Sequence, residues 1–328
     1  MFVLLGHLFQ ASVGESPWKW TIYGFHMPLL LGISGYLNVA LEQSNLRACF
    51  KRYGRRLLAP WTLAFVIYTS IFVKIPNAEG LLWSILHPWY HLWFVPVLFA
   101  YISASAIRLT VKQSVAMSLA VALTSQFILG FFSYPGCREL LPTFVKKVRP
   151  WAGDSRLYTL CSSYFFGTYV RSVSPALSTP TTAARLAVGA ACGLLSWVCA
   201  YESTSFVVVS GSFLMLNLFA TGCLPFVFSS LQLRNSFLEH LGRESLFYYL
   251  WHPLPFAALK SLICPRVSWP VAFSLTLGLS LAVLYSLLTA LRRYSAFSGL
   301  ATAVGVAPDS SPTCKTHSSL ANANSQDR

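Results

Sequence analysis

Long apolar runs separated by short polar or basic segments dominate the chain. A helix needs about 20 apolar residues to cross the hydrocarbon core of a bilayer, because all its backbone polar groups must be paired internally. The runs that reach this length without a charge are Thr21–Leu41, Gly80–Ile107, Gln113–Cys137, Ser203–Leu233 and Val267–Leu291. The shorter runs are Leu57–Val73, Leu157–Val170, Leu186–Tyr201 and Ser245–Leu259. The pattern therefore predicts nine membrane-spanning helices.

The two ends of the chain differ from this pattern. Met1–Val13 is apolar but too short to span, and it lacks the basic start and small-residue cleavage site of a signal peptide. We interpret it as the second half of a tenth helix. Pro308–Arg328 is rich in Ser, Thr and Asn and has little to bury. The expected fold is an all-α, polytopic transmembrane bundle of about nine to ten spans, with a truncated first helix. It occupies residues 1–295 and is followed by a disordered polar tail over residues 296–328.

Composition supports a membrane protein. Hydrophobic residues make up 55% of the chain and charged residues 10%, whereas soluble domains carry about 25% charged residues. These values argue against a cytosolic enzyme, a disordered chain and a disulfide scaffold. The net charge of +14 comes from basic residues between the apolar runs, which is typical of loop anchors rather than of a nucleic-acid interface. The bilayer is thus an expected partner, and nucleic acid is not.

The orientation follows from the distribution of Lys and Arg. The densest short basic loop is expected in the cytoplasm, and it contains Arg47, Lys51, Arg52, Arg55 and Arg56. Alternation then places the C-terminal tail in the cytoplasm too, for a multi-pass protein of the plasma (inner) membrane or an endomembrane. The basic loop Tyr134–Arg156 falls on the opposite side. Either one span is miscounted or this loop meets an anionic partner, and we favour the second explanation.

Ionisable side chains inside apolar segments are costly and indicate function. Four histidines lie in or beside such segments: His7, His26, His91 and His252. Imidazole gains and loses a proton near neutral pH and is the most frequent general base. Any one of these histidines could instead form a helix-interface hydrogen bond, but four of them with few carboxylates nearby favour proton-transfer chemistry. His87 and His91 have a spacing that suits a metal, yet they lack a third ligand nearby, so we expect no metal site.

Four segments carry a family resemblance in a fixed order: FHMPLLLGISGYL (Phe25–Leu37), KRYGRRLLAP (Lys51–Pro60), HLWFVPVL (His91–Leu98) and GRESLFYYLWHPL (Gly242–Leu254). Together they resemble the motifs of the acyltransferase 3 family, especially its fucose 4-O-acetyltransferase-like members, over about residues 1–295. The resemblance implies an integral membrane enzyme of about ten helices. Such an enzyme takes an acyl group, usually acetyl from acetyl-CoA on the cytoplasmic face, and transfers it to a sugar hydroxyl of a glycan or glycolipid.

The resemblance also suggests a catalytic residue. The family's first helix carries an Arg, ten further residues and a His, and the His matches His7. His7 would act as the general base or as a transient acyl carrier. The matching Arg would precede Met1, so either the annotated start is late or the chain is a truncated inactive relative. A non-catalytic glycan transporter, using the histidines as a polar lining, is the other alternative.

The matched basic segment suggests a donor site. The guanidinium groups of Arg52, Arg55 and Arg56 suit phosphates, so the phosphates of CoA are a sensible partner, although plain cytoplasmic anchoring explains these arginines equally well. Ser34 and Gly35 are small and allow a helix or a ligand to approach closely.

Three further residues have two interpretations each. His26 binds the substrate or assists His7, or it forms a helix-interface hydrogen bond. Trp93 lines the acceptor or pantetheine channel, or it is an ordinary interface tryptophan. His252 precedes Pro253, which removes a backbone hydrogen bond, so it either faces a water-filled cavity or only links helices.

Overall fold

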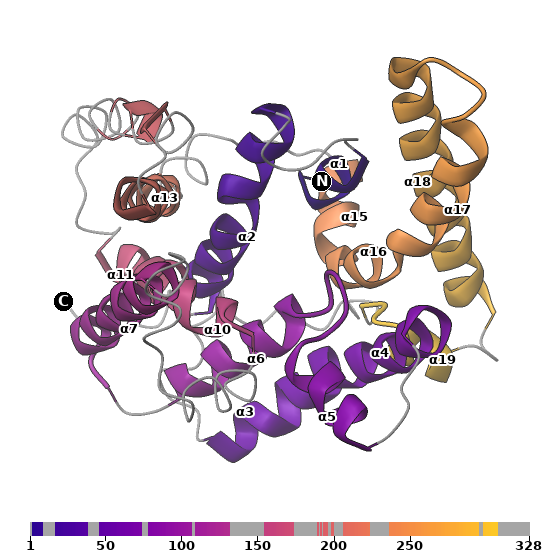
Figure 1. The fold of residues 1–328 in the computed structure, drawn as a ribbon. Coiled ribbons are helices and arrows are strands. Elements are labelled where there is room, and N and C mark those ends of the chain that lie inside the picture. The colour runs from indigo at the N-terminus through magenta and orange to yellow at the C-terminus, as the bar shows by residue number, and fades with distance from the viewer. Residues whose placement is uncertain are drawn as a thin grey trace, which may run out of the picture.

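The computed structural model describes residues 2–8, 17–38, 46–73, 78–106, 109–131, 154–173, 206–223, 236–294 and 298–307, and also 189, 191, 193–195 and 198–199. Over these ranges the regular elements are all helical (Figure 1), as the sequence predicts. Most of the predicted span Leu186–Tyr201, the end of Ser203–Leu233, the basic loop up to residue 153 and the tail 308–328 lie outside the described residues.

Helix α2 (Pro17–Leu37) runs through the centre of the structure (Figure 1). On one side it packs against α11 (Cys161–Val173) and α13 (Phe206–Gly222), and α7 (Val111–Phe131) packs against α11. On the other side it contacts α1 (Phe2–Leu8). Since α2 reaches both halves of the helical assembly, its residues can line more than one site.

Small residues let α2 and α11 touch along their backbones. A Cβ atom added to Gly35 would lie 2.0 Å from the carbonyl oxygen of Tyr164, and one added to Gly167 would lie 2.2 Å from that of Gly32. Both distances are far below van der Waals contact, so no larger residue fits without separating the helices. The close approach expected at Gly35 is therefore a contact with another helix.

The basic segment lies on an irregular helical turn. Helix α3 (Leu46–Tyr53) continues through a π-helical turn (Gly54–Leu58) into α4 (Ala59–Phe72). Pro60 is the second residue of α4, two positions after the turn, and it has no N–H for the regular helical hydrogen bond; a wider turn accommodates such a residue. Arg55 and Arg56 thus project from a bulge, a feature that often marks functional sites.

The run Gly80–Ile107 does not form the single span that we predicted. It is divided into α5 (Ala78–Leu86) and α6 (Phe94–Ser105). Pro88 disfavours helical backbone at the preceding residue, and Tyr90 has a positive φ of 54°, which no α-helix contains. The non-helical residues 87–93 carry a histidine and two tryptophans into the interior.

Five C-terminal helices extend from the centre to the right of Figure 1, next to α1 and α4. They are α15 (Ser236–Arg243), α16 (Ser245–Trp251), α17 (Pro253–Ile263), α18 (Trp269–Arg293) and α19 (Ser298–Ala303). The predicted span Ser245–Leu259 is divided between α16 and α17 at His252, because Pro253 begins a new helix.

Packed structure continues beyond residue 295, where the sequence analysis places the start of the polar tail. Ala301 and Val306 are buried in the hydrophobic core, and the indole Nε1 of Trp251 donates a hydrogen bond of 2.9 Å to the Val304 carbonyl. The packed structure therefore continues to Ala307, because apolar residues after position 298 pack against the hydrophobic core.

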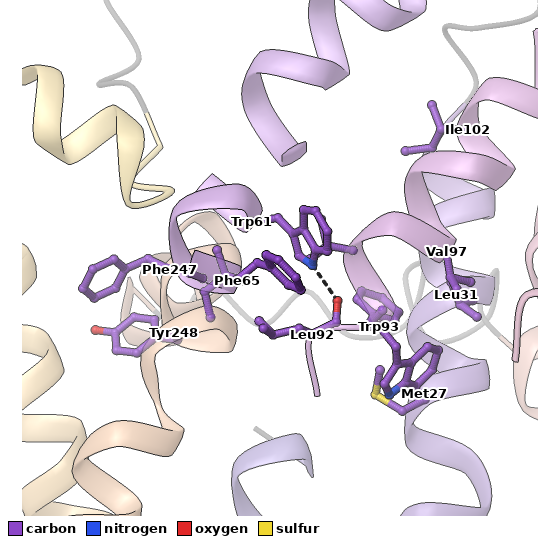
Figure 2. Packing of buried hydrophobic residues seen from close by; sticks show 14 of the residues in the cluster. Met27, Leu31, Trp61, Phe65, Leu92, Trp93, Val97, Ile102, Phe247 and Tyr248 are labelled. Atoms are coloured by element: carbon purple, nitrogen blue, oxygen red, sulfur yellow. Dashed lines mark hydrogen bonds between the residues drawn. The ribbon is translucent and has the colours of Figure 1, made fainter. Parts of the chain in front are cut away.

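Aromatic and aliphatic side chains from α2, α4, α6 and α16 meet in the main hydrophobic core (Figure 2). Trp61 and Phe65 of α4 stack with ring centroids 5.2 Å apart. The indole nitrogen of Trp61 donates a hydrogen bond of 2.8 Å to the Leu92 carbonyl. This bond pairs an otherwise unpaired backbone carbonyl and fixes the non-helical residues 87–93 against α4.

Helix α18 is a candidate membrane span. Its 25 residues include a window with a mean hydropathy of 2.0, of which 28% is buried. Val271, Leu275, Leu279, Val283 and Leu287 form an exposed apolar stripe at four-residue intervals. Among the described residues no other helix meets the same length and hydropathy criteria, although shorter apolar stretches occur at Ile22–Leu37, Phe94–Ser105, Gly211–Gly222 and Pro253–Ile263.

Candidate functional site

Three histidines from distant parts of the sequence meet in the interior. The rings of His7 and His252 are stacked with centroids 5.1 Å apart. The His91 ring lies 5.2 Å from that of His252 and 6.5 Å from that of His7. We call these residues the histidine cluster. They come from α1, from the non-helical residues 87–93 and from the junction of α16 and α17.

Apolar packing on α1 holds His7 in place. Leu4 and Leu8 are buried in a small core with Phe256 of α17 and with α18. Gly6 faces Tyr23, where an added Cβ would lie 2.9 Å from the ring. The short helix α1 is therefore wedged between α2 and the α17–α18 pair.

Two tyrosines contact one nitrogen of His7. The hydroxyl of Tyr23 lies 3.0 Å from Nδ1 of His7, and the hydroxyl of Tyr90 also forms a hydrogen bond with Nδ1. When Nδ1 carries the proton and donates it to a tyrosine oxygen, Nε2 is the basic nitrogen. In this tautomer Nε2 can act as a general base.

The other two members of the cluster are deeply buried, with His252 fully inaccessible. Nδ1 of His252 donates to the carbonyls of Tyr249 (2.8 Å) and Tyr248 (3.1 Å). Nε2 of His91 donates to the carbonyl of Leu250 (3.3 Å). Because carbonyls only accept, the second nitrogen of each ring is an acceptor, and neither finds a hydrogen-bond partner in the part of the chain that the structure describes. Such buried unpaired atoms are rare and often have a catalytic role.

A cavity of about 580 Å³ lies beside the cluster. His7, His26 and His91 line it, and its aromatic walls include Trp93 and Tyr249. The amides of Gln126 and Asn217, the hydroxyls of Ser162 and Ser163, and the guanidinium of Arg156 add polar groups to the lining. This volume is typical of a small-molecule site, as is the mixture of aromatic surface and a few polar groups. We call it the histidine cavity.

His26 and Trp93 both have partners that fix their orientation. Nδ1 of His26 donates to the Ile22 carbonyl at 2.6 Å, so Nε2 is the acceptor nitrogen. The guanidinium of Arg156 lies 4.5 Å from the centroid of the Trp93 ring, in a cation–π contact. Asp154 forms an ion pair with Arg156 at 3.6 Å.

A second pocket of about 890 Å³ lies elsewhere on the structure. Five cationic side chains line it, namely Lys51, Arg52, Arg55, Arg56 and Arg243. Its lining includes no Asp or Glu among the described residues. Ser34 also lines it and donates its hydroxyl to the Leu30 carbonyl at 2.8 Å. Clustered guanidinium groups without carboxylates attract phosphate. We call it the arginine pocket.

Helix α2 connects the two sites. Tyr23, Gly24, His26, Met27 and Pro28 of α2 border the histidine cavity, and Ser34 and Leu37, with Asn38 directly after the helix, border the arginine pocket. At 1.5 Å per residue, His26 and Asn38 are about 18 Å apart along the helix axis.

The structure thus sorts the residues predicted from the sequence into two groups. His7, His26 and Trp93 line the histidine cavity, and His252 stacks on His7 behind it. Ser34 and the three predicted arginines line the other pocket. His87 lies against Trp83, with ring centroids 4.2 Å apart, and lines neither site.

The sequence analysis gave no site role to several residues that the structure places there. His91, Tyr23, Tyr90 and Tyr249 surround the histidine cavity, and Lys51 and Arg243 belong to the arginine pocket. His91 was recognisable as a buried histidine, but only the helix break after Pro88 brings it to His252. Tyr23 and Tyr90 carried no sequence pattern of their own.

Comparison with known proteins gives one match. No curated protein and no solved structure matches the chain. The family model of an acyltransferase domain, acyltransferase 3, matches residues 1–289, a span that contains every residue of the histidine cluster and all five cations of the arginine pocket. The chain therefore belongs to the acyltransferase 3 family.

Proposed function

We propose that this acyltransferase moves an acyl group, acetyl in the simplest case, from acyl-CoA to a sugar hydroxyl of a glycan or glycolipid at a membrane. The single observation that carries the proposal is the placement of a cationic pocket and a histidine-lined cavity at the two ends of α2. Two sites of different chemistry, linked by one helix, suit a donor with a charged head and a reactive far end.

The arginine pocket binds the nucleotide end of CoA in this proposal. The phosphates of CoA contact Arg52, Arg55 and Arg56, with Lys51 and Arg243 nearby. The distance of about 18 Å along α2 is comparable with the length of an extended pantetheine arm. The thioester then reaches the histidine cavity beside His26 and Trp93.

The acceptor occupies the histidine cavity. A sugar ring has apolar C–H faces and hydroxyl edges, and it matches a lining of aromatic rings with amide and hydroxyl groups. Trp93 and Tyr249 offer the aromatic surface, while Asn217 and Ser163 offer hydrogen bonds. Held in this way, one sugar hydroxyl faces His7.

Acyl transfer then needs one base. Nε2 of His7 takes the proton of the sugar hydroxyl as its oxygen attacks the thioester carbonyl, a C–O bond forms, and the C–S bond breaks. The CoA thiolate leaves and takes this proton from Nε2, so the products are an ester and free CoA, and His7 is again neutral. Tyr23 and Tyr90 hold Nδ1 of His7, and His252 stacks on its ring and restricts its orientation. His26 binds the acceptor or shares the proton. No step in this route uses a metal.

Membrane placement follows the charges. The apolar stripe of α18 faces lipid, and further helices of the chain span with it as a multi-pass bundle. Arg292 at the end of α18 pairs with Glu244, next to Arg243 of the arginine pocket. These basic residues support a cytoplasmic position of the pocket and of the C-terminal tail in this proposal, on the side where acyl-CoA is available.

The test is acceptor-dependent acetyl transfer in membranes. Membranes with and without the full chain receive acetyl-CoA labelled in the acetyl group, together with glycolipid or oligosaccharide acceptors. We expect CoA thiol release that requires the acceptor, and label in the glycan fraction that mild alkali removes as an ester. CoA release that does not require an acceptor contradicts the proposal. Movement of the glycan across the membrane without incorporation of label also contradicts it, and this is the result expected of a glycan carrier.

A further inference from the structure

The arginine pocket has a wall that comes from the end of the described chain. Four residues of this wall line the pocket, namely Thr302, Gly305, Val306 and Ala307. The described residues 298–307 include no acidic or basic side chain. All four lie after residue 289, where the match to the acyltransferase family ends. We call residues 298–307 the C-terminal segment.

Three kinds of contact hold the C-terminal segment in place. The Ala307 N–H donates to the Glu244 carboxylate at 3.0 Å, and the indole of Trp251 donates to the Val304 carbonyl at 2.9 Å. Ala301 and Val306 are buried. The segment is therefore docked by polar and apolar contacts together.

A left-handed glycine lets the chain turn along the pocket. Gly305 has a φ of 92°, which L-residues rarely adopt. An added Cβ there would lie 3.3 Å from side-chain atoms of both Leu246 and Pro60. Pro60 follows the bulge that carries Arg55 and Arg56. The segment thus packs directly beside the turn that presents the arginines.

Glu244 links the segment to one of the five pocket cations. Its fully buried carboxylate binds Arg292 and the Ala307 N–H and forms an ion pair with Arg243 at 3.8 Å. It does not itself line the pocket. The docked wall therefore presents hydroxyl, methyl and backbone groups, and the opposite wall presents the positive charges.

We propose that the C-terminal segment is the closing wall of the acyl-CoA pocket and that Thr302 is a donor-binding residue. The inference rests on the proposed function and adds to it a determinant outside the matched family region. An uncharged wall adds no carboxylate beside Lys51, Arg52, Arg55 and Arg56, and it accommodates the less polar parts of the donor. A charge placed at Thr302 therefore acts on the phosphates of a bound CoA.

The test is a charge series at this exposed position. Thr302→Lys, Thr302→Gln and Thr302→Glu are made in the full chain and purified in detergent. The dissociation constant for CoA is measured by calorimetry at low salt. We expect Thr302→Gln to remain close to wild type, Thr302→Glu to bind about fivefold more weakly, and Thr302→Lys to bind more tightly. About fivefold corresponds to ~1 kcal/mol for unit charges near 4 Å apart in a largely aqueous setting.

Two comparisons give the result its meaning. Pantetheine, which lacks the nucleotide phosphates, should compete for the site equally well in all three variants. Equal CoA affinity across the series, while Arg55→Gln weakens binding, overturns the inference and leaves the proposed function standing. If the wild-type chain itself binds no CoA, both fail.

Discussion

The role of the arginine pocket can be tested at Arg55, which projects from the π-helical turn. Arg55 is exposed and lines the pocket with four other cations. A hydrogen bond to a charged group contributes about 1.5–3 kcal/mol when it is shielded. Because this side chain is exposed, solvent screening reduces the contribution to ~1 kcal/mol. Arg55→Gln should therefore raise the KM for acetyl-CoA about fivefold, with little change in kcat.

A donor without phosphates separates binding of the nucleotide from other effects. The same membranes are assayed with acetyl-CoA and with S-acetylpantetheine at two salt concentrations. We expect Arg55→Gln to raise the KM only for acetyl-CoA, and the difference from wild type to shrink at high salt. The matched control is Arg293→Gln, which removes an exposed arginine that lines neither pocket. Equal effects on both donors, or the same effect in Arg293→Gln, would refute the phosphate-binding role.

Two further predictions concern the scaffold. Gly35→Ala places a methyl group 2.0 Å from the Tyr164 carbonyl, so it should lower the detergent melting temperature and destabilise the chain by about 1–3 kcal/mol. An unchanged melting temperature would contradict the backbone contact of α2 with α11. Glu244→Gln leaves Arg292 without its charged partner and should lower the free energy of unfolding by about 3 kcal/mol. This value is at the low end for a buried pair because Arg292 is one-quarter exposed. The exposed Glu239→Gln should cost almost nothing, and equal melting temperatures for the two glutamate variants would count against the buried ion pair.

The helices themselves could largely be predicted from the sequence. The run Gln113–Cys137 contains most of α7, and Val267–Leu291 corresponds to α18 within two residues at each end. Length and the absence of charge suffice for such elements, because a continuous apolar run with no proline in its interior has few alternatives to a helix.

The breaks in the helices were harder to predict. Gly80–Ile107 is apolar throughout, and the sequence contained the cause of its interruption in Pro88. The position of the interrupted backbone also depends on the tertiary contact of residues 87–93 with α4, through the bond from Trp61 to Leu92. A hydropathy pattern does not predict such tertiary contacts. It likewise does not predict the docking of residues 298–307 onto Trp251 and Glu244.

The candidate site was partly accessible from the sequence. His7, His26 and the arginines of residues 52–56 were identifiable as polar groups beside apolar runs, or as matches to the family motifs. Their division between two pockets depends on the direction of α2, and the meeting of His91 with His252 depends on two helix breaks. Neither can be derived from residue spacing along one chain.

The most direct test of the proposed chemistry is the turnover of His7→Ala in acceptor-dependent acetyl transfer, measured beside His87→Ala as a histidine that lines neither pocket. General-base catalysis contributes about 10²–10⁴-fold, so kcat should fall at least a hundredfold in His7→Ala while CoA affinity stays within twofold of wild type. His87→Ala should retain wild-type turnover. Near-normal turnover of His7→Ala, at normal expression, would contradict the assignment of His7 as the base.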